Sequence, residues 1–171
     1  SHDLDKLDCG SWFHTDYADC TIPRLETFLE WIDHRIKLFL DVKWAPLPEL
    51  IQLVQQKGYS DQTFFWFGRD KFARAFRELS RDLALKINVA STQDINEAIE
   101  QYGASIVELD LIEEAAELIT HCEQLGIRSM IKFDGSSEHV FQQICELAPD
   151  MVNVDYADAF IKVRASSLKT T

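Results

Sequence analysis

Residues 36–58 read IKLFLDVKWAPLPELIQLVQQKG, and this stretch contains one complete structural unit. Its first part, residues 36–43, is a largely apolar run that predicts a β-strand. Its second part, residues 46–58, is opened by prolines, has apolar residues at helical spacing and is closed by Gly58, which predicts an α-helix. A strand followed directly by a helix is therefore the pattern to look for in the rest of the sequence.

The strand–helix pair recurs along the whole chain. Five further strands are predicted at residues 62–67, 83–89, 104–111, 127–133 and 150–155. Helices are predicted around them at residues 21–35, 70–80, 91–103, 112–126, 136–149 and 156–166. Strict alternation with short connections predicts an α/β fold with a parallel sheet.

Two parallel architectures compete for these units. A doubly wound open sheet usually carries a glycine-rich turn after its first strand, whereas the six glycines of this sequence are not clustered. A (β/α)8 TIM barrel needs eight units, and the sequence opens with irregular residues and a helix, not with a strand. We therefore expect a TIM barrel with the first two βα units absent from this chain.

Composition limits the classes of function. The 171 residues are 46% apolar and 27% charged, as in an ordinary globular domain. The net charge of −12 argues against a nucleic-acid partner, because binding phosphate backbones needs basic surface. It leaves room for a small phosphorylated substrate held by local cations. The oligomeric state stays open.

The apolar segments of the sequence bear on the cellular compartment of the protein. No stretch approaches the roughly 20 apolar residues of a membrane span. The opening SHDLDKLDCG has neither the basic start nor the apolar region of a signal peptide. We expect a cytoplasmic protein, or a secreted or periplasmic one if a signal peptide lies upstream.

The four cysteines include no closely spaced pair of the kind that binds zinc. Cys122 and Cys145 lie in apolar helical patterns, which predicts core positions. Cys9 and Cys20 flank a loop and could form a disulfide in an oxidising compartment, and the sequence leaves that pairing open.

Side chains alternate between two faces along each predicted strand. In residues 36–43 the face with Asp41 and Lys43 is expected to point into the barrel, and the opposite, apolar face is expected to meet the helices. Other strands also end with polar side chains on the inward face: Lys86, Asn88, Glu108, Asp110, Lys132, Asn153 and Asp155. Barrel active sites are built from these strand ends, so the functional site is predicted there.

These residue types favour phosphate chemistry. Acidic residues at strand ends suit a hard divalent cation such as Mg²⁺ or Ca²⁺. A neighbouring lysine suits a phosphate oxygen as a point charge. A metal and a lysine around a phosphodiester form a reasonable hydrolytic site. The alternative is that Asp41 and Lys43 form only an internal ion pair, and spacing alone does not decide between the two.

Four segments, spread over nearly the whole sequence, follow a familiar order: KLDCGSWF (residues 6–13), TIPRLETFLEW (21–31), LFLDVK (38–43) and DMVNVDYADAF (150–160). Together they resemble the glycerophosphodiester phosphodiesterase family. This resemblance implies a (β/α)8 barrel and metal-dependent hydrolysis of glycerophosphodiesters to an alcohol and glycerol 3-phosphate. It also implies that residues 1–22 are the remnant of a small insertion after strand 2, and that residues 23–171 run from helix 2 through strand 8 to the last helix.

The resemblance implies roles for a few residues. Asp41 matches a metal-binding acid that is usually glutamate, and Lys43 matches a lysine that contacts the substrate phosphate. Trp66, where serine is common, and the inward-facing Glu108 are assigned to substrate binding. The sequence departs from the family pattern at three further positions: Lys132 for tryptophan, Val154 for threonine and Ala157 for proline.

The catalytic histidines of the family belong to its first two units. The segment SHD at residues 1–3 has a histidine and an aspartate but lies too close to LDCG to be the family motif. The other histidines, His14, His34, His121 and His139, fall in loop or helix patterns and are expected to be surface or packing residues. Two rival functions remain: another phosphodiesterase on the same barrel, such as a sphingomyelinase D-like enzyme, and a non-catalytic ligand-binding barrel.

Overall fold

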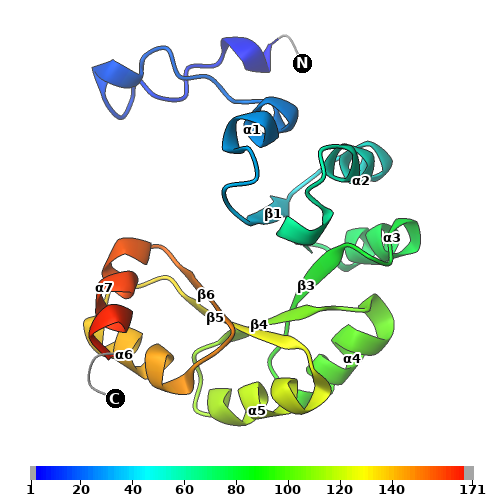
Figure 1. Cartoon of the computed structure of the whole chain (residues 1–171), viewed down its shortest axis with the longest axis vertical. Helices are drawn as coiled ribbons and strands as arrows, with labels where there is room; N and C mark the ends of the chain where they lie inside the picture. The colour runs from blue at the N-terminus through cyan, green and yellow to red at the C-terminus, as the bar shows by residue number, and fades with distance from the viewer. Residues whose placement is uncertain (1–2, 168–171) are drawn as a thin grey trace.

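The computed structural model describes residues 3–167, which form seven α-helices and six β-strands (Figure 1). The strands are β1 (Leu38–Val42), β2 (Thr63–Phe67), β3 (Ala84–Asn88), β4 (Ile106–Asp110), β5 (Arg128–Phe133) and β6 (Met151–Val154). The α-helices are α1 (Leu25–Ile32), α2 (Leu47–Gln56), α3 (Asp70–Leu79), α4 (Thr92–Tyr102), α5 (Ala115–Leu125), α6 (Glu138–Leu147) and α7 (Ala157–Ser167). Strands and helices therefore alternate as the sequence predicts.

Helix α1 is shorter than the predicted residues 21–35. It begins at Leu25, so Pro23 lies before the helix and not in its first turn. It ends at Ile32 because Asp33 and His34 both have positive φ angles, of 43° and 56°, which a right-handed helix cannot continue through. The chain then turns directly into β1.

The six strands form one parallel sheet in the order β1-β2-β3-β4-β5-β6. Sequential order in a parallel sheet is the order of a barrel, whereas a doubly wound sheet reverses direction at a switch point. Figure 1 shows the sheet curled, with α2 to α7 around its outer side. The predicted α/β barrel architecture is therefore confirmed for six strands, as a partly open barrel.

Two apolar layers follow the predicted strand faces. The outward layer packs against the helices and includes Leu38, Phe65, Leu85, Leu109 and Ile131, which are at most 5% exposed. The inward layer is smaller: Phe64, Ile106 and Met130 form a cluster against which Ala84 and Met151 pack. The assignment of faces from alternation is thus correct, and it fixes which side chains reach the interior.

One hydrogen bond joins side chains that are two strands apart, which requires a strongly curved sheet. Asn153 on β6 donates from Nδ2 to Glu108 Oε2 on β4 over 3.0 Å, although β5 lies between these strands. In a flat sheet, side chains two strands apart stand about 9–10 Å apart at their bases, since neighbouring strands are about 4.8 Å apart. Inward curvature therefore brings the two side chains together.

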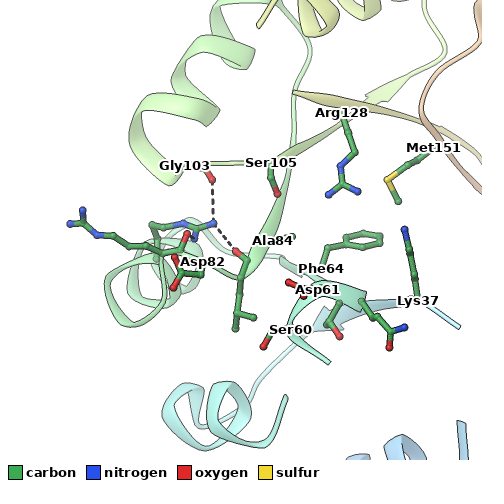
Figure 2. A pocket seen from close by; sticks show the side chains of 15 residues that line it. Lys37, Ser60, Asp61, Phe64, Asp82, Ala84, Gly103, Ser105, Arg128 and Met151 are labelled. Atoms are coloured by element: carbon green, nitrogen blue, oxygen red, sulfur yellow. Dashed lines mark hydrogen bonds between the residues drawn. The ribbon is translucent and has the colours of Figure 1, made fainter. Parts of the chain in front are cut away.

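A cavity of about 350 Å³ lies at the amino-terminal ends of the strands, opposite the predicted site (Figure 2). Arg77 of α3 is fixed beside it. Its guanidinium donates to the carbonyl oxygens of Ser80, Arg81, Leu83, Tyr102 and Gly103 over 2.6–3.2 Å. Burial lowers the pKa of Arg77, and the charge of Asp82 raises it. This end of the sheet is therefore held by hydrogen bonds that join the carboxyl-terminal ends of α3 and α4.

We expect Arg77→Met to lower the free energy of unfolding by about 2 kcal/mol, the scale of hydrogen bonds to a charged group. The methionine keeps an unbranched side chain but leaves the carbonyl groups without their donor. Urea unfolding followed by circular dichroism measures the change. Arg81→Met is the matched control, because Arg81 is exposed and contributes only its carbonyl oxygen. Equal unfolding midpoints for the two variants would contradict this role.

The segment before α1 contains two short 3-10 helices, Leu4–Lys6 and Thr15–Tyr17. The amide of Cys9 donates to the carbonyl of Cys20 over 2.8 Å, which closes the loop between them. Both thiols are exposed and free in the structure. Cys122 is buried and Cys145 partly buried, in agreement with their predicted core positions.

Candidate active site

Polar side chains gather at the carboxyl-terminal ends of the strands, on the inward face of the sheet. We call this set the mouth cluster: Asp41, Lys43, Trp66, Lys86, Glu108, Lys132 and Asn153. It contains all four residues that the sequence predicts for the site. It also contains Lys86, Lys132 and Asn153, for which the sequence predicts an inward position but no role.

Asp41 and Lys43 form an ion pair at the end of β1. Lys43 Nζ lies 2.8 Å from each oxygen of the Asp41 carboxylate. The two side chains are 43% (Asp41) and 73% (Lys43) exposed, so solvent reaches both. An exposed pair of this kind contributes little to stability, typically about 0.2–1 kcal/mol. Both groups are therefore accessible to a ligand, and the pair itself does not account for their placement.

Trp66 lies close to two lysines. Lys43 Nζ is 4.7 Å from the centre of the indole ring, and Lys86 Nζ is 4.9 Å from it. Both distances are within the range of cation–π attraction. Trp66 is half-buried and follows the inward alternation of β2, so its ring contacts both the exposed lysine and the buried one.

Glu108 forms a buried ion pair with Lys86. Lys86 Nζ is 2.8 Å from Glu108 Oε1, and the side chains are 2% (Lys86) and 4% (Glu108) exposed. Asn153 binds the other carboxylate oxygen. Burial lowers the pKa of Lys86, and the bond to Glu108 raises it. Both carboxylate oxygens of Glu108 are therefore bound within the protein. Its assignment to substrate contact stays a prediction.

A third ion pair lies at the end of β5. Lys132 Nζ is 2.8 Å from Asp134 Oδ2, and this hydrogen bond is the main cause that raises the pKa of Lys132. The lysine is 40% exposed and belongs to the inward face. The mouth therefore carries two accessible ammonium groups, Lys43 directly after β1 and Lys132 near the end of β5.

The described residues fit a divalent cation only in part. Within residues 3–167 there is no group of three histidine, cysteine, aspartate or glutamate side chains placed to hold a metal. Asp41 has an accessible carboxylate, and hard cations such as Mg²⁺ and Ca²⁺ prefer oxygen ligands of this kind. Asp41 could supply one ligand to such a cation, and the described residues do not supply a full set of side-chain ligands.

None of the described histidines belongs to the mouth cluster. His34 stacks on Tyr59 with ring centres 4.1 Å apart, and His121 contacts Asn96. His14 bonds the amide of Asp16 in the amino-terminal segment, and His139 is exposed on α6. These positions agree with surface or packing roles. His2, in the SHD segment, lies outside the described residues.

No helix within residues 3–167 has the length and apolar character to cross a bilayer.

Comparison of the sequence with protein-family models and with curated proteins gives no match. Solved structures do match, and glycerophosphodiester phosphodiesterases are among the similar chains.

Three of these structures show the extent of the similarity. The enzyme from Agrobacterium tumefaciens superposes with a TM-score of 0.82 at 23% identity, over 96% of this chain and 70% of its own. The enzyme from Parabacteroides distasonis gives 0.78 at 14% identity, over 98% and 71%. A phosphodiesterase from Oleispira antarctica, solved with the product sn-glycerol-3-phosphate, gives 0.80 at 18% identity, over 95% and 69%.

This chain spans between 57% and 71% of the length of such neighbours. Identities below 25% establish the fold and leave activity to be argued from the site. At the level of structure, the resemblance seen in the sequence is confirmed: this chain has the α/β-barrel fold of the solved glycerophosphodiester phosphodiesterases.

Proposed function

We propose that the protein hydrolyses glycerophosphodiesters to an alcohol and glycerol 3-phosphate at the mouth cluster. The observation that carries this proposal is the accessible Asp41–Lys43 pair at the carboxyl-terminal end of β1, where barrels place their chemistry. The fold similarity supports it, since one neighbour was solved with sn-glycerol-3-phosphate.

We also propose that two further strand–helix units precede residue 1 and complete the barrel. Among the described residues, β1 and β6 each pair with only one strand. Exposed strand edges are a liability that barrels remove by closing. Residues 1–22 then belong to the insertion after the second strand, and residues 23–171 to the rest of the barrel.

The roles of the residues follow from their charge and exposure. Lys43 binds a phosphoryl oxygen and stabilises the negative charge that builds on it in the transition state. Asp41 supplies one carboxylate ligand to Mg²⁺ or Ca²⁺. When bound, the cation polarises the phosphoryl oxygen. A histidine pair in the preceding units acts as general acid and base.

The test is hydrolysis by the full-length protein. Glycerophosphocholine and glycerophosphoethanolamine are incubated with the protein and Mg²⁺ or Ca²⁺, and glycerol 3-phosphate is measured, with EDTA as the control for metal dependence. Release of glycerol 3-phosphate that EDTA abolishes is the expected result. Choline released from sphingomyelin or lysophosphatidylcholine instead would favour the sphingomyelinase D-like alternative. Binding of glycerol 3-phosphate without turnover of any substrate would favour a ligand-binding barrel.

A further inference from the structure

A buried ion pair adjoins the accessible part of the mouth, in contact with Trp66. Lys86 on β3 and Glu108 on β4 are almost completely removed from solvent, with their charged atoms 2.8 Å apart. The Lys86 ammonium also lies 5.1 Å from the ring of Phe39 and 4.9 Å from the ring of Trp66. One buried cation is therefore enclosed by a carboxylate and two aromatic rings.

Stability alone is a weak reason for such a pair. Removing two charges from water costs free energy that their attraction only partly returns, so well-packed apolar residues often serve as well. Loss of one partner is costly, because the other charge is left buried and unpaired. The pair is therefore better explained by what it holds in place than by net stabilisation.

Contacts lead from this pair to the surface of the mouth. Asn153 and Lys86 fix the two oxygens of Glu108. Lys86 rests against Trp66, and Lys43 contacts the same ring at 4.7 Å. Phe39 stacks on Phe64 with ring centres 4.8 Å apart, which limits the space in which Lys86 can move. Lys43 itself is long and mostly exposed, so the indole ring is its main support besides Asp41.

We propose that Lys86 is a positioning residue: held by Glu108, it fixes the Trp66 ring against which the Lys43 ammonium is placed for the substrate phosphate. The proposal rests on the proposed phosphodiesterase function for its kinetic consequence. Its structural part, the fixing of Trp66, is independent of any substrate. An oriented cation is more effective than a mobile one, because the cost of ordering it is not incurred during the reaction.

The test uses a variant that removes both buried charges. Lys86→Met alone leaves Glu108 unpaired and endangers folding, so the double variant Lys86→Met/Glu108→Gln is made in the full-length protein. Glutamine can still accept the hydrogen bond from Asn153. The control is Lys162→Met/Asp158→Asn, which removes an exposed ion pair on α7 that includes no residue of the mouth cluster. Melting curves establish that both variants are folded.

The first measurement follows Trp66 without substrate. Trp12, Trp31 and Trp44 are 80%, 69% and 77% exposed, and changing them to phenylalanine leaves Trp66 as the one tryptophan of this chain. Any tryptophan upstream of residue 1 is replaced as well. We expect the double variant to increase acrylamide quenching of Trp66 and to lower its fluorescence anisotropy. Unchanged quenching and anisotropy in a folded double variant would overturn the proposal.

The second measurement is a kinetic cycle with Lys43. We expect the double variant to lower kcat by on the order of 10- to 100-fold, the scale of a misplaced catalytic group, with little change in KM. In a Lys43→Ala background the same double change should cost almost nothing, because the group that it positions is gone. An equal loss in both backgrounds would assign the pair a general structural role instead. If the wild-type protein hydrolyses no glycerophosphodiester, the proposed function fails, and the fluorescence result still decides whether Lys86 fixes Trp66.

Discussion

Lys43→Ala is expected to lower kcat for glycerophosphodiester hydrolysis by about 10²–10³-fold, by analogy with the loss of one donor to a developing oxyanion. The ammonium is accessible at the end of β1 and is held there by Asp41 and Trp66. Because negative charge on the phosphoryl oxygens is greatest in the transition state, the loss should fall mainly on kcat and little on KM.

Steady-state release of glycerol 3-phosphate from glycerophosphocholine by full-length variants measures this effect. Lys43→Arg keeps the charge with a different geometry and should retain part of the activity. Lys162→Ala, on the exposed side of α7, is the matched lysine control and should behave as wild type. Turnover by Lys43→Ala at the wild-type rate would show that Lys43 has no part in catalysis.

The fold was predictable because apolar and polar side chains alternate along the strands, which shows which face of each strand meets the helices. Along β1, Leu38 and Leu40 pack toward the helices while Phe39 and Asp41 point inward, as period-two patterning requires. The same pattern in the other strands, with helices between them, leaves few arrangements other than a parallel barrel. The end of α1 was harder to predict, because no glycine or other simple sequence pattern indicates the left-handed conformation of Asp33 and His34.

The inner part of the site was not predictable in the same way. Alternation places Lys86 and Glu108 on the inward face, but it does not pair them. In the strand register Glu108 is opposite Asn88, so the ion pair with Lys86 is diagonal. The bond from Asn153 to Glu108 depends on the curvature of the whole sheet. Such contacts follow from register and curl, which a single sequence does not specify.

The second large effect is expected for Asp41→Asn. This variant should raise the Mg²⁺ or Ca²⁺ concentration needed for half-maximal activity by at least about 10-fold. Even residues that only hydrogen-bond the ligands of a metal change the metal affinity by about 10–100-fold when they are mutated. Asparagine keeps the size and one oxygen but removes the negative charge that a hard cation prefers. High metal should therefore restore part of the rate. Asp41→Glu keeps the carboxylate and should need far less added metal than Asp41→Asn.

The alternative hypothesis, in which Asp41 only pairs with Lys43, can be separated from this one. An internal pair, as considered from the sequence, predicts that changing Asp41 leaves a buried lysine unpaired. Lys43 is instead 73% exposed, so losing this pair should hardly alter the melting temperature under either hypothesis. The metal titration therefore decides between them. If Asp41→Asn loses activity but requires the same metal concentration as wild type, Asp41 orients Lys43 and is not a metal ligand.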